Sequence, residues 1–198
     1  MIPRIIHQIH LGETPSPQIR KWMASIRRHH PRWEYRLWDE QGIYEGLRID
    51  VAALPYTKAA GKANVVRLHV VRQFGGIYLD TDIECLRPMD SLLGYRAFAA
   101  RQSDGRLCNA VFGAVPNHPW IDAQLALAPR YHGSPGGWGP RVMTEAQTED
   151  VTIVPTEWFY SWSWNAPEQE QRVHPGAILV HYWAKSWWPN RVPNNERT

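Results

Sequence analysis

The sequence is poor in cysteine and contains no long apolar run. Its two cysteines, Cys85 and Cys108, are too few for a disulfide framework and lack the C-x-x-C spacing of a metal site, so they are typical of thiols in a reducing compartment. No stretch approaches about 18 consecutive apolar residues, and the start, MIPRIIHQIHLG, lacks the features of a secretory signal. We therefore expect a cytoplasmic protein that contacts the inner membrane surface at most peripherally.

A strong excess of one charge is also missing. The chain has 22 Lys and Arg residues against 19 Asp and Glu residues, and its only lysines are Lys21, Lys58, Lys62 and Lys185. Because the basic residues look scattered, the composition favours anionic small molecules or anionic lipid surfaces as partners and argues against nucleic acid. The sequence leaves the oligomeric state open.

Aromatic residues, in contrast, are plentiful. The chain has 11 tryptophans, several of them near its end in EWFYSWSW and HYWAKSWW. Aromatic faces suit sugar rings and bases, but a small domain also uses them in its core, and we favour the core for most of them. A length of 198 residues is suitable for a single domain over residues 1–198.

Strand and helix patterns alternate along the chain. Strands are expected where short or alternating apolar runs occur, and helices where apolar residues recur at helical spacing. A serine at position 16 and Gly75 would begin and end helices. The expected strands are 3–10, 32–39 with Trp33, Tyr35 and Leu37 half buried, 76–79, 95–100, 109–115, 151–154 and 177–181; the expected helices are 16–30, 58–74 and 119–128; and residues 129–141 are expected to form a loop. This order predicts an α/β, Rossmann-like fold with a central, mostly parallel mixed sheet flanked by helices.

Two aspartates one residue apart follow the apolar strand 76–79. Residues i and i+2 of an extended segment face the same side, so Asp80 and Asp82 can point to one place at the carboxyl end of the strand, where ligands of open α/β sheets bind. Two converging carboxylates repel each other unless a cation lies between them. The pair therefore indicates a metal site, although a D-x-D in a solvated turn is the simpler alternative.

The preceding helix and a late strand add further candidates. Asn64 and Arg67 lie one helical turn apart, and Arg67 could bind a phosphate through two hydrogen bonds, unless it is simply an exposed surface arginine. The strand AILVH ends at His181, which could complete a metal site or could simply be packed. A shell of carboxylates and imidazole suits Mn²⁺ better than Mg²⁺.

Several motifs in order now define a resemblance. IPRIIHQIH, GKANVVRLHVVRQFGGIYLDTD, NAVFGAVPNHPW, GGWGP and HYWAKSW together resemble the DXD-containing glycosyltransferases of the yeast initiating mannosyltransferase and bacterial capsule type, which are distantly similar to the glucosylating domain of large clostridial toxins. The resemblance covers nearly the whole chain. It implies a GT-A fold, a UDP- or GDP-sugar donor, Mn²⁺ or Mg²⁺, a saccharide or glycolipid acceptor, and retention of anomeric configuration.

The resemblance also implies roles for individual residues. Asp82 would be the principal metal ligand, with Asp80 and His181 completing the metal site, and Arg67 would join the two aspartates as a catalytic group. Asn109, Gly139 and Pro140 would shape the sugar and acceptor pocket. The donor-binding set would be Ile6, His10, Asn64, Arg67, Asp80, Lys185, Ser186 and Trp187, and residues 181–198 would form a flexible tail that closes the active site.

Two positions depart from the family pattern. Many relatives have tryptophan where this chain has His10, and the pattern usually has aspartate where this chain has Asn64. Both changes affect the identity of the nucleotide more than the type of reaction.

The predicted activity is metal-dependent, retaining transfer of a hexose from a nucleoside-diphosphate sugar to a hydroxyl in cell-surface polysaccharide synthesis. Two alternatives remain. An aspartyl-phosphate hydrolase would use the first aspartate as its nucleophile, but it expects Thr or Val at the place of Glu84 and the motif on an early strand. A carbohydrate-binding protein without turnover would use the tryptophans and a structural Ca²⁺, for which a histidine ligand is unsuitable.

Overall fold

The computed structural model describes residues 1–134 and 137–184. The strands are β1 (Ile5–Ile9), β2 (Glu34–Trp38), β3 (Gly76–Leu79), β4 (Ile83–Cys85), β5 (Ala97–Arg101), β6 (Leu107–Ala114), β7 (Val151–Val154) and β8 (Leu179–His181). The α-helices are α1 (Pro17–His29), α2 (Glu40–Leu47), α3 (Ala59–Phe74), α4 (Pro119–Leu127) and α5 (Gly139–Glu145), and short 3₁₀ helices cover Asp90–Gly94, Ala128–Tyr131, Thr156–Trp158 and Glu168–Glu170.

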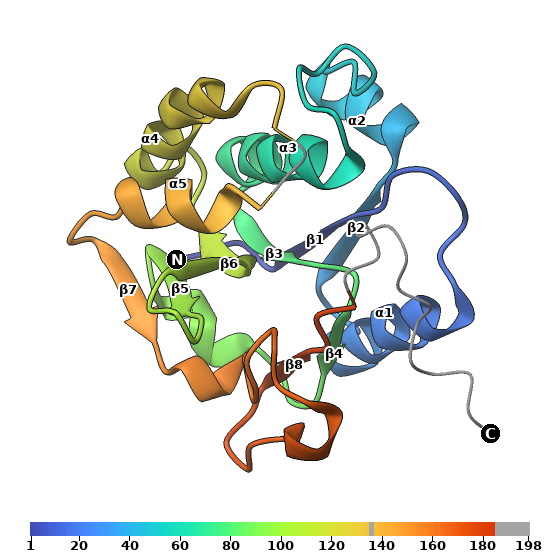
Figure 1. Ribbon diagram of the computed structural model, residues 1–198, viewed down its shortest axis with the longest axis vertical. Coiled ribbons are helices and arrows are strands. Elements are labelled where there is room, and N and C mark those ends of the chain that lie inside the picture. Colours follow the sequence, from blue (N-terminus) through green and yellow to red (C-terminus); the bar gives the residue numbers. More distant parts are fainter. Residues whose placement is uncertain (135–136, 185–198) are drawn as a thin grey trace.

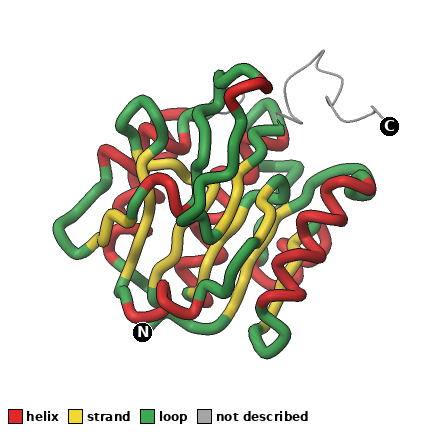
Figure 2. Tube along the Cα trace, turned by 90° about the horizontal axis from the view of Figure 1, so that it is seen from below, coloured by secondary structure: helices red, strands yellow, loops and turns green. Residues whose placement is uncertain are grey.

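Six strands form one mixed sheet in the order β2-β1-β3-β6-β5-β7. The pairs β1–β2, β1–β3 and β5–β7 are parallel, whereas β6 runs antiparallel to both of its neighbours, β3 and β5. Five strands therefore run in one direction and only β6 opposes them, so the predicted mostly parallel mixed sheet is confirmed. Figure 2 shows the strands side by side through the middle of the molecule, with helices around them.

A hydrophobic core lies on each face of this sheet. Helices α3, α4 and α5 cover one face, where Val66, Val70 and Trp120 are buried (Figure 1). On the other face the sheet packs with α1 and a small antiparallel sheet of β4 and β8, and this core contains Ile77 and Phe98. Since the two sheets share this second core, the position of β8 relative to β3 is set by packing.

Local sequence signals account for the ends of the first helices. Ser16 caps α1 by accepting a hydrogen bond from the Ile19 N–H (3.3 Å), and Pro17 occupies the first helical position. Gly75 ends α3 with φ +63°, and Gly76 follows with φ +98°. A side chain at Gly76 would place its Cβ 2.6 Å from the Ile5 carbonyl oxygen, so glycine allows β3 to lie against β1.

Some sequence predictions need correction. The expected loop 129–141 contains a 3₁₀ helix and the start of α5, so Gly139 and Pro140 begin a helix and do not form a free turn. Helix α2 and strand β4 were not predicted, because α2 is short and contains two glycines and β4 has only three residues. Leu37, expected to be half buried, is 42% exposed, and Trp38 is the buried residue at the end of β2.

Other expectations hold. The strand at 177–181 is confirmed as β8, and Cys85 and Cys108 are free and buried. Among the described residues, no helix combines the length and the apolar character needed to cross a membrane. The single domain over the whole chain stays a prediction.

His7 in β1 is a buried, uncharged histidine. Its Nδ1 faces the Trp38 indole N–H at 3.1 Å, and its Nε2 lies 2.8 Å from the Gly75 carbonyl oxygen. Because indole N–H can only donate, Nδ1 accepts and Nε2 carries the proton that is donated to Gly75. Burial is the main cause that lowers the pKa of His7 from 6.5 to about 4.

This histidine predicts a loss of stability in acid. The unfolded chain takes up a proton near pH 6.5, whereas the folded protein does so only near pH 4. The stabilisation that the neutral His7 contributes is therefore fully present above about pH 6.5. The free energy of unfolding should fall by about 3 kcal/mol as the pH drops to 4. Urea unfolding across this range measures the effect. His7→Gln, which cannot titrate, should show a shallower decline, and equal declines in both proteins would contradict the assignment.

Candidate active site: two aspartates, a histidine and a buried arginine

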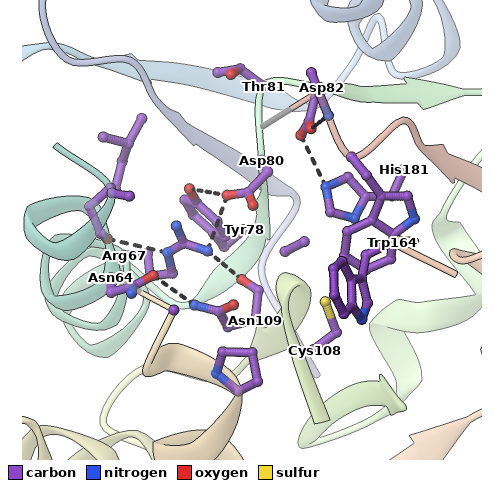
Figure 3. Close-up of a pocket in the computed structure, with 18 of the residues that line it drawn as sticks. Asn64, Arg67, Tyr78, Asp80, Thr81, Asp82, Cys108, Asn109, Trp164 and His181 are labelled. Carbon is purple, nitrogen blue, oxygen red and sulfur yellow. Dashed lines mark hydrogen bonds and ion pairs between the residues drawn. The ribbon is translucent and has the colours of Figure 1, made fainter. Parts of the chain in front are cut away.

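A pocket of about 490 Å³ opens at the edge of the main sheet where β1 and β3 end and β6 begins. The close-up in Figure 3 shows its polar groups. The first turns of α3 and the start of α5 also border it. Of the residues that the sequence singled out, those that line the pocket are His10, Asn64, Arg67, Asp80, Asp82, Asn109, Pro140 and His181.

Asp80 is held firmly at the end of β3. Its backbone N–H donates to the Ala110 carbonyl at 2.8 Å, and its own carbonyl accepts from the Gln8 side-chain amide at 2.9 Å. Its carboxylate accepts from the Tyr78 hydroxyl at 2.8 Å and pairs with Arg67 at 3.1 Å. Because both the backbone and the carboxylate of Asp80 are held by neighbouring groups, the carboxylate has a defined direction into the pocket.

Asp82 and His181 meet because β4 pairs with β8. The register places Ile83 opposite His181, so Asp82, one residue earlier, lies beside the imidazole. The His181 Nε2 is 3.2 Å from an Asp82 carboxylate oxygen, and the other oxygen accepts from the Ala184 N–H at 2.8 Å. The Tyr182 N–H donates to the Asp82 carbonyl at 3.1 Å. The end of β8 therefore holds Asp82 on both its backbone and its side chain.

The charges in this cluster shift one another's pKa values. Burial is the largest influence on Asp80 and raises its pKa; Arg67 opposes the rise and Asp82 adds to it. Burial acts in the same direction on Asp82, but attraction and hydrogen bonding from His181, with the Ala184 N–H, outweigh it and lower the pKa. Burial disfavours the His181 imidazolium, yet Asp82 prevails and raises the pKa of His181 to about 10. Asp82 and His181 therefore form an ion pair at neutral pH.

Asp80, Asp82 and His181 fit a divalent metal ion. One ligand atom from each lies within 4.8 Å of the other two. Two carboxylates and an imidazole are a donor set suited to Mn²⁺. Burial, with the neighbouring Asp82, raises the pKa of Asp80 despite Arg67, and a divalent cation bound there would favour the charged form of this carboxylate. A metal would compete with the proton on His181, because only the neutral imidazole binds metal.

Arg67 is buried rather than exposed on the surface of α3. Its side chain is 6% exposed, it donates to the Asn109 carbonyl at 2.6 Å, and its guanidinium lies 4.5 Å from the centre of the Tyr78 ring. Burial disfavours its charge, but Asp80 outweighs this and raises the pKa of Arg67. The arginine thus joins α3, β3 and β6 around the Asp80 carboxylate, as the dashed lines in Figure 3 show.

Asn64 and Asn109 form the adjoining wall of the pocket. The Asn109 side-chain amide donates to the Asn64 side-chain oxygen at 2.8 Å. Gly139 does not line the pocket itself; it allows Asn109 to approach α5, because a Cβ at position 139 would lie 1.9 Å from the Asn109 amide nitrogen. Of the two residues expected to shape the sugar pocket, Pro140 lines the pocket directly, and Gly139 affects it only by allowing Asn109 to lie close to α5.

The remaining expected donor residues have different positions. His10 lines the pocket, and its Nε2 is 2.7 Å from the Glu13 carbonyl oxygen. Ile6 is 1% exposed, packs in the core and does not line the pocket, so its contact with the donor stays a prediction. Lys185, Ser186 and Trp187 lie outside the described residues, as does most of the expected closing tail.

Sequence reasoning missed the groups that support Asp80. The Tyr35 hydroxyl donates to the Gln8 side-chain oxygen at 2.6 Å, and Gln8 in turn holds the Asp80 carbonyl. Gln8 is fully buried and lies between His7 and Ile9, and a polar residue in a strand that is expected to be buried is the signal that could have revealed it. Trp164, 42% exposed at the pocket, was likewise not distinguished from the core tryptophans.

A mixed sheet with a pair of carboxylates directly after the end of a central strand is the arrangement of GT-A glycosyltransferases. The solved structures agree on the fold. The glycosyltransferase GlyE of Streptococcus pneumoniae matches 98% of this chain and 58% of its own, with a TM-score of 0.60 and 16% identity. PaToxG glycosyltransferase matches 73% of this chain and 67% of its own, with a TM-score of 0.59 and 19% identity. The predicted GT-A fold is confirmed.

Within that class, residues 16–99 match the model of the family described as glycosyltransferase sugar-binding region containing DXD motif, so the resemblance seen in the sequence is confirmed. Inositol phosphoceramide mannosyltransferase 3 of Schizosaccharomyces pombe is 33% identical over 66% of this chain and 38% of its own. Mannosyl phosphorylinositol ceramide synthase CSH1 of Saccharomyces cerevisiae is 30% identical over 91% of this chain and 50% of its own. The chain therefore spans about half or less of the length of these relatives.

We predict that His181→Ala weakens Mn²⁺ binding about tenfold or more, because one of the three candidate ligands is lost. Calorimetric titration of the protein with Mn²⁺ measures the affinity. His174→Ala, which alters an exposed histidine in a surface loop, is the control and should bind as the unchanged protein does. If the affinity of His181→Ala is unchanged, His181 is a packed residue and not a ligand.

We also predict that Gly139→Ala lowers stability by about 1–3 kcal/mol, because the added Cβ collides with the Asn109 amide. Urea unfolding measures the change. Gly94→Ala is the control, since a Cβ there meets nothing within 4 Å. Replacing Asn109 by alanine in the Gly139→Ala protein should recover part of the loss; a full loss in the double variant would place the strain elsewhere.

Proposed function

We propose that the chain is a metal-dependent, retaining glycosyltransferase that moves a hexose from a nucleoside-diphosphate sugar to a hydroxyl of a saccharide or glycolipid. The observation that carries the proposal is the convergence of Asp80, Asp82 and His181 in one pocket at the edge of a GT-A sheet. The family match supports the same class of reaction. We place the activity in cell-surface polysaccharide synthesis, on the cytoplasmic side.

The proposed roles follow from the positions of the side chains. Asp82, His181 and Asp80 would hold Mn²⁺ or Mg²⁺, which when bound neutralises the charge of the departing nucleoside diphosphate. Arg67 orients Asp80 and brings a permanent positive charge to the floor of the pocket, which adds to the stabilisation of the leaving group. Asn64 and His10 are proposed donor contacts, and Asn109 and Pro140 the wall of the sugar pocket.

Retention is what the family resemblance implies, and the carboxylates of the pocket favour a route without a covalent sugar intermediate. Three aspartates line it among the described residues, and Asp80 and Asp82 are assigned to the metal. The third, Asp104, pairs with Arg106 at 3.2 Å. Since no remaining carboxylate is left over as a nucleophile among the described lining residues, we propose attack of the acceptor from the same side as the leaving group.

Glycolipids are the proposed acceptor class with the most support. Several of the matched fungal relatives are named as mannosyltransferases of inositol phosphoceramide, and the mannosyl group is one candidate for the transferred hexose. Trp164, which is 42% exposed, brings an aromatic side chain to the pocket, and an aromatic face suits a sugar ring. A carbohydrate-binding protein without turnover remains the alternative, because the same aromatic face would also serve that role.

A panel of sugar nucleotides tests the proposal. GDP-mannose, UDP-glucose, UDP-galactose and UDP-N-acetylglucosamine are each added with Mn²⁺, and the melting temperature and the slow hydrolysis of the donor are measured. We expect one donor to raise the melting temperature and to be hydrolysed only in the presence of metal. Stabilisation by free sugars without hydrolysis of any donor would support the binding protein instead.

Asp82→Asn should lower the turnover of the accepted donor by about a hundredfold or more, since it removes a charged ligand with almost no change in volume. The hydrogen bond from the Ala184 N–H can still be accepted, so the fold should remain intact. Asp122→Asn, which changes an exposed aspartate paired with Arg72, is the control and should keep full turnover. Substantial activity of Asp82→Asn would reject the metal role of this residue.

A further inference from the structure

The basic residues are less scattered than the sequence suggested. Residues 14–33 contain five of the 22 Lys and Arg residues and none of the 19 Asp and Glu residues, so the rest of the chain has a formal excess of two negative charges. The five are Arg20, Lys21, Arg27, Arg28 and Arg32. The positive net charge of the chain therefore arises in α1 and the turn that follows it.

These five side chains face outward, away from the core. All five are exposed, and none takes part in an ion pair within the described part of the chain. Arg20 donates to the Pro15 carbonyl, and Arg27 lies over the Tyr35 ring. By contrast, Arg36, Arg72 and Arg130 each have an acidic partner. Helix α1 lies at the edge of the molecule, so this charge is presented to the surroundings (Figure 1).

The basic face continues into a depression at the end of α1. Its lining includes Arg4, Arg28, His29 and Arg32. The one acidic residue in the lining, Asp90, lies 3.6 Å from Arg4, and both side chains are more than half exposed, so this pair is strongly screened by water. The depression is thus a concave place in which positive charge exceeds negative charge, as a phosphate group requires.

We propose that α1 and the turn to Arg32 bind the surface of an anionic membrane, with lipid phosphates seated in the depression beside Arg28 and Arg32. A helix of 13 residues is about 20 Å long, and its convex basic face matches a flat layer of headgroups better than a nucleic-acid strand, which needs a groove or stacking aromatics. The aromatic residues of this stretch, Trp22 and Trp33, are buried and offer no base a platform.

The other end of α1 connects this face to the candidate active site. Ile19, in the first turn of α1, lines the catalytic pocket. A membrane bound along α1 would therefore lie near the pocket, where the headgroup of a glycolipid acceptor could enter. This last step rests on the proposed function, whereas membrane binding itself does not depend on any catalytic activity.

Sedimentation with vesicles tests the inference without any substrate. The protein is mixed with vesicles of phosphatidylcholine alone and of phosphatidylcholine with phosphatidylserine. We expect binding to the anionic vesicles only, weakening as salt is added. Each basic residue near an anionic surface contributes about fivefold, so Arg28→Gln with Arg32→Gln should lower the partition coefficient about thirtyfold. Arg96→Gln with Arg141→Gln, two exposed arginines outside this face, changes the net charge equally and should bind normally.

Each other outcome would overturn the proposal. Equal losses in the two double variants would show that net charge alone attracts the protein, and equal binding to both kinds of vesicle would remove the role of charge. Displacement by inorganic phosphate at constant ionic strength would assign the depression to a soluble anion. Tighter binding to a DNA duplex than to anionic vesicles, lost in the Arg28 and Arg32 variant, would assign the face to nucleic acid. Donor hydrolysis, measured separately, reports on the proposed function alone.

Discussion

The ion pair between the buried Arg67 and the partly buried Asp80 is the interaction on which the candidate site depends. It joins α3 to the end of β3, and the Asn109 carbonyl ties the same guanidinium to β6. A buried ion pair contributes little net stability, because desolvation offsets most of the attraction, but losing one partner leaves an uncompensated charge. The pair therefore fixes the direction of one carboxylate. Tyr78 donates a hydrogen bond to the same carboxylate, and Gln8 donates to the backbone carbonyl of Asp80.

The second half of the site has a different origin. Asp82 owes its position to the small sheet, in which β4 and β8 bring together residues about 100 positions apart in the sequence. The protonated His181 neutralises Asp82, while Asp80 has Arg67 as its partner. Each carboxylate of the DXD motif thus has a cationic partner within the chain. A metal ion would replace the pair between Asp82 and His181 and leave the pair between Asp80 and Arg67 in place.

Much of the framework was predictable because its signals are local. The capping serine of α1, the glycines after α3 and the short apolar run of β3 each describe their own neighbourhood, and the structure agrees with them. Tertiary packing overruled the local pattern at Leu37 and at Gly139. Helix α3 shows the limit most clearly: its apolar stripe suggested one buried face, but the helix is enclosed on several sides, so Asn64 and Arg67 are buried too.

The amino-acid sequence by itself determined the order of strands and helices, the carboxylate pair at the end of β3 and the resemblance to a glycosyltransferase family. These properties follow from hydrophobic period, turn residues and motif order, all of which act over a few residues. Only the tertiary structure decided that His181 meets Asp82, that Gln8 supports Asp80 and that the charge of residues 14–33 lies on one exposed face. Distances between segments far apart in the chain depend on how two layers pack against a shared core, and no local pattern encodes them.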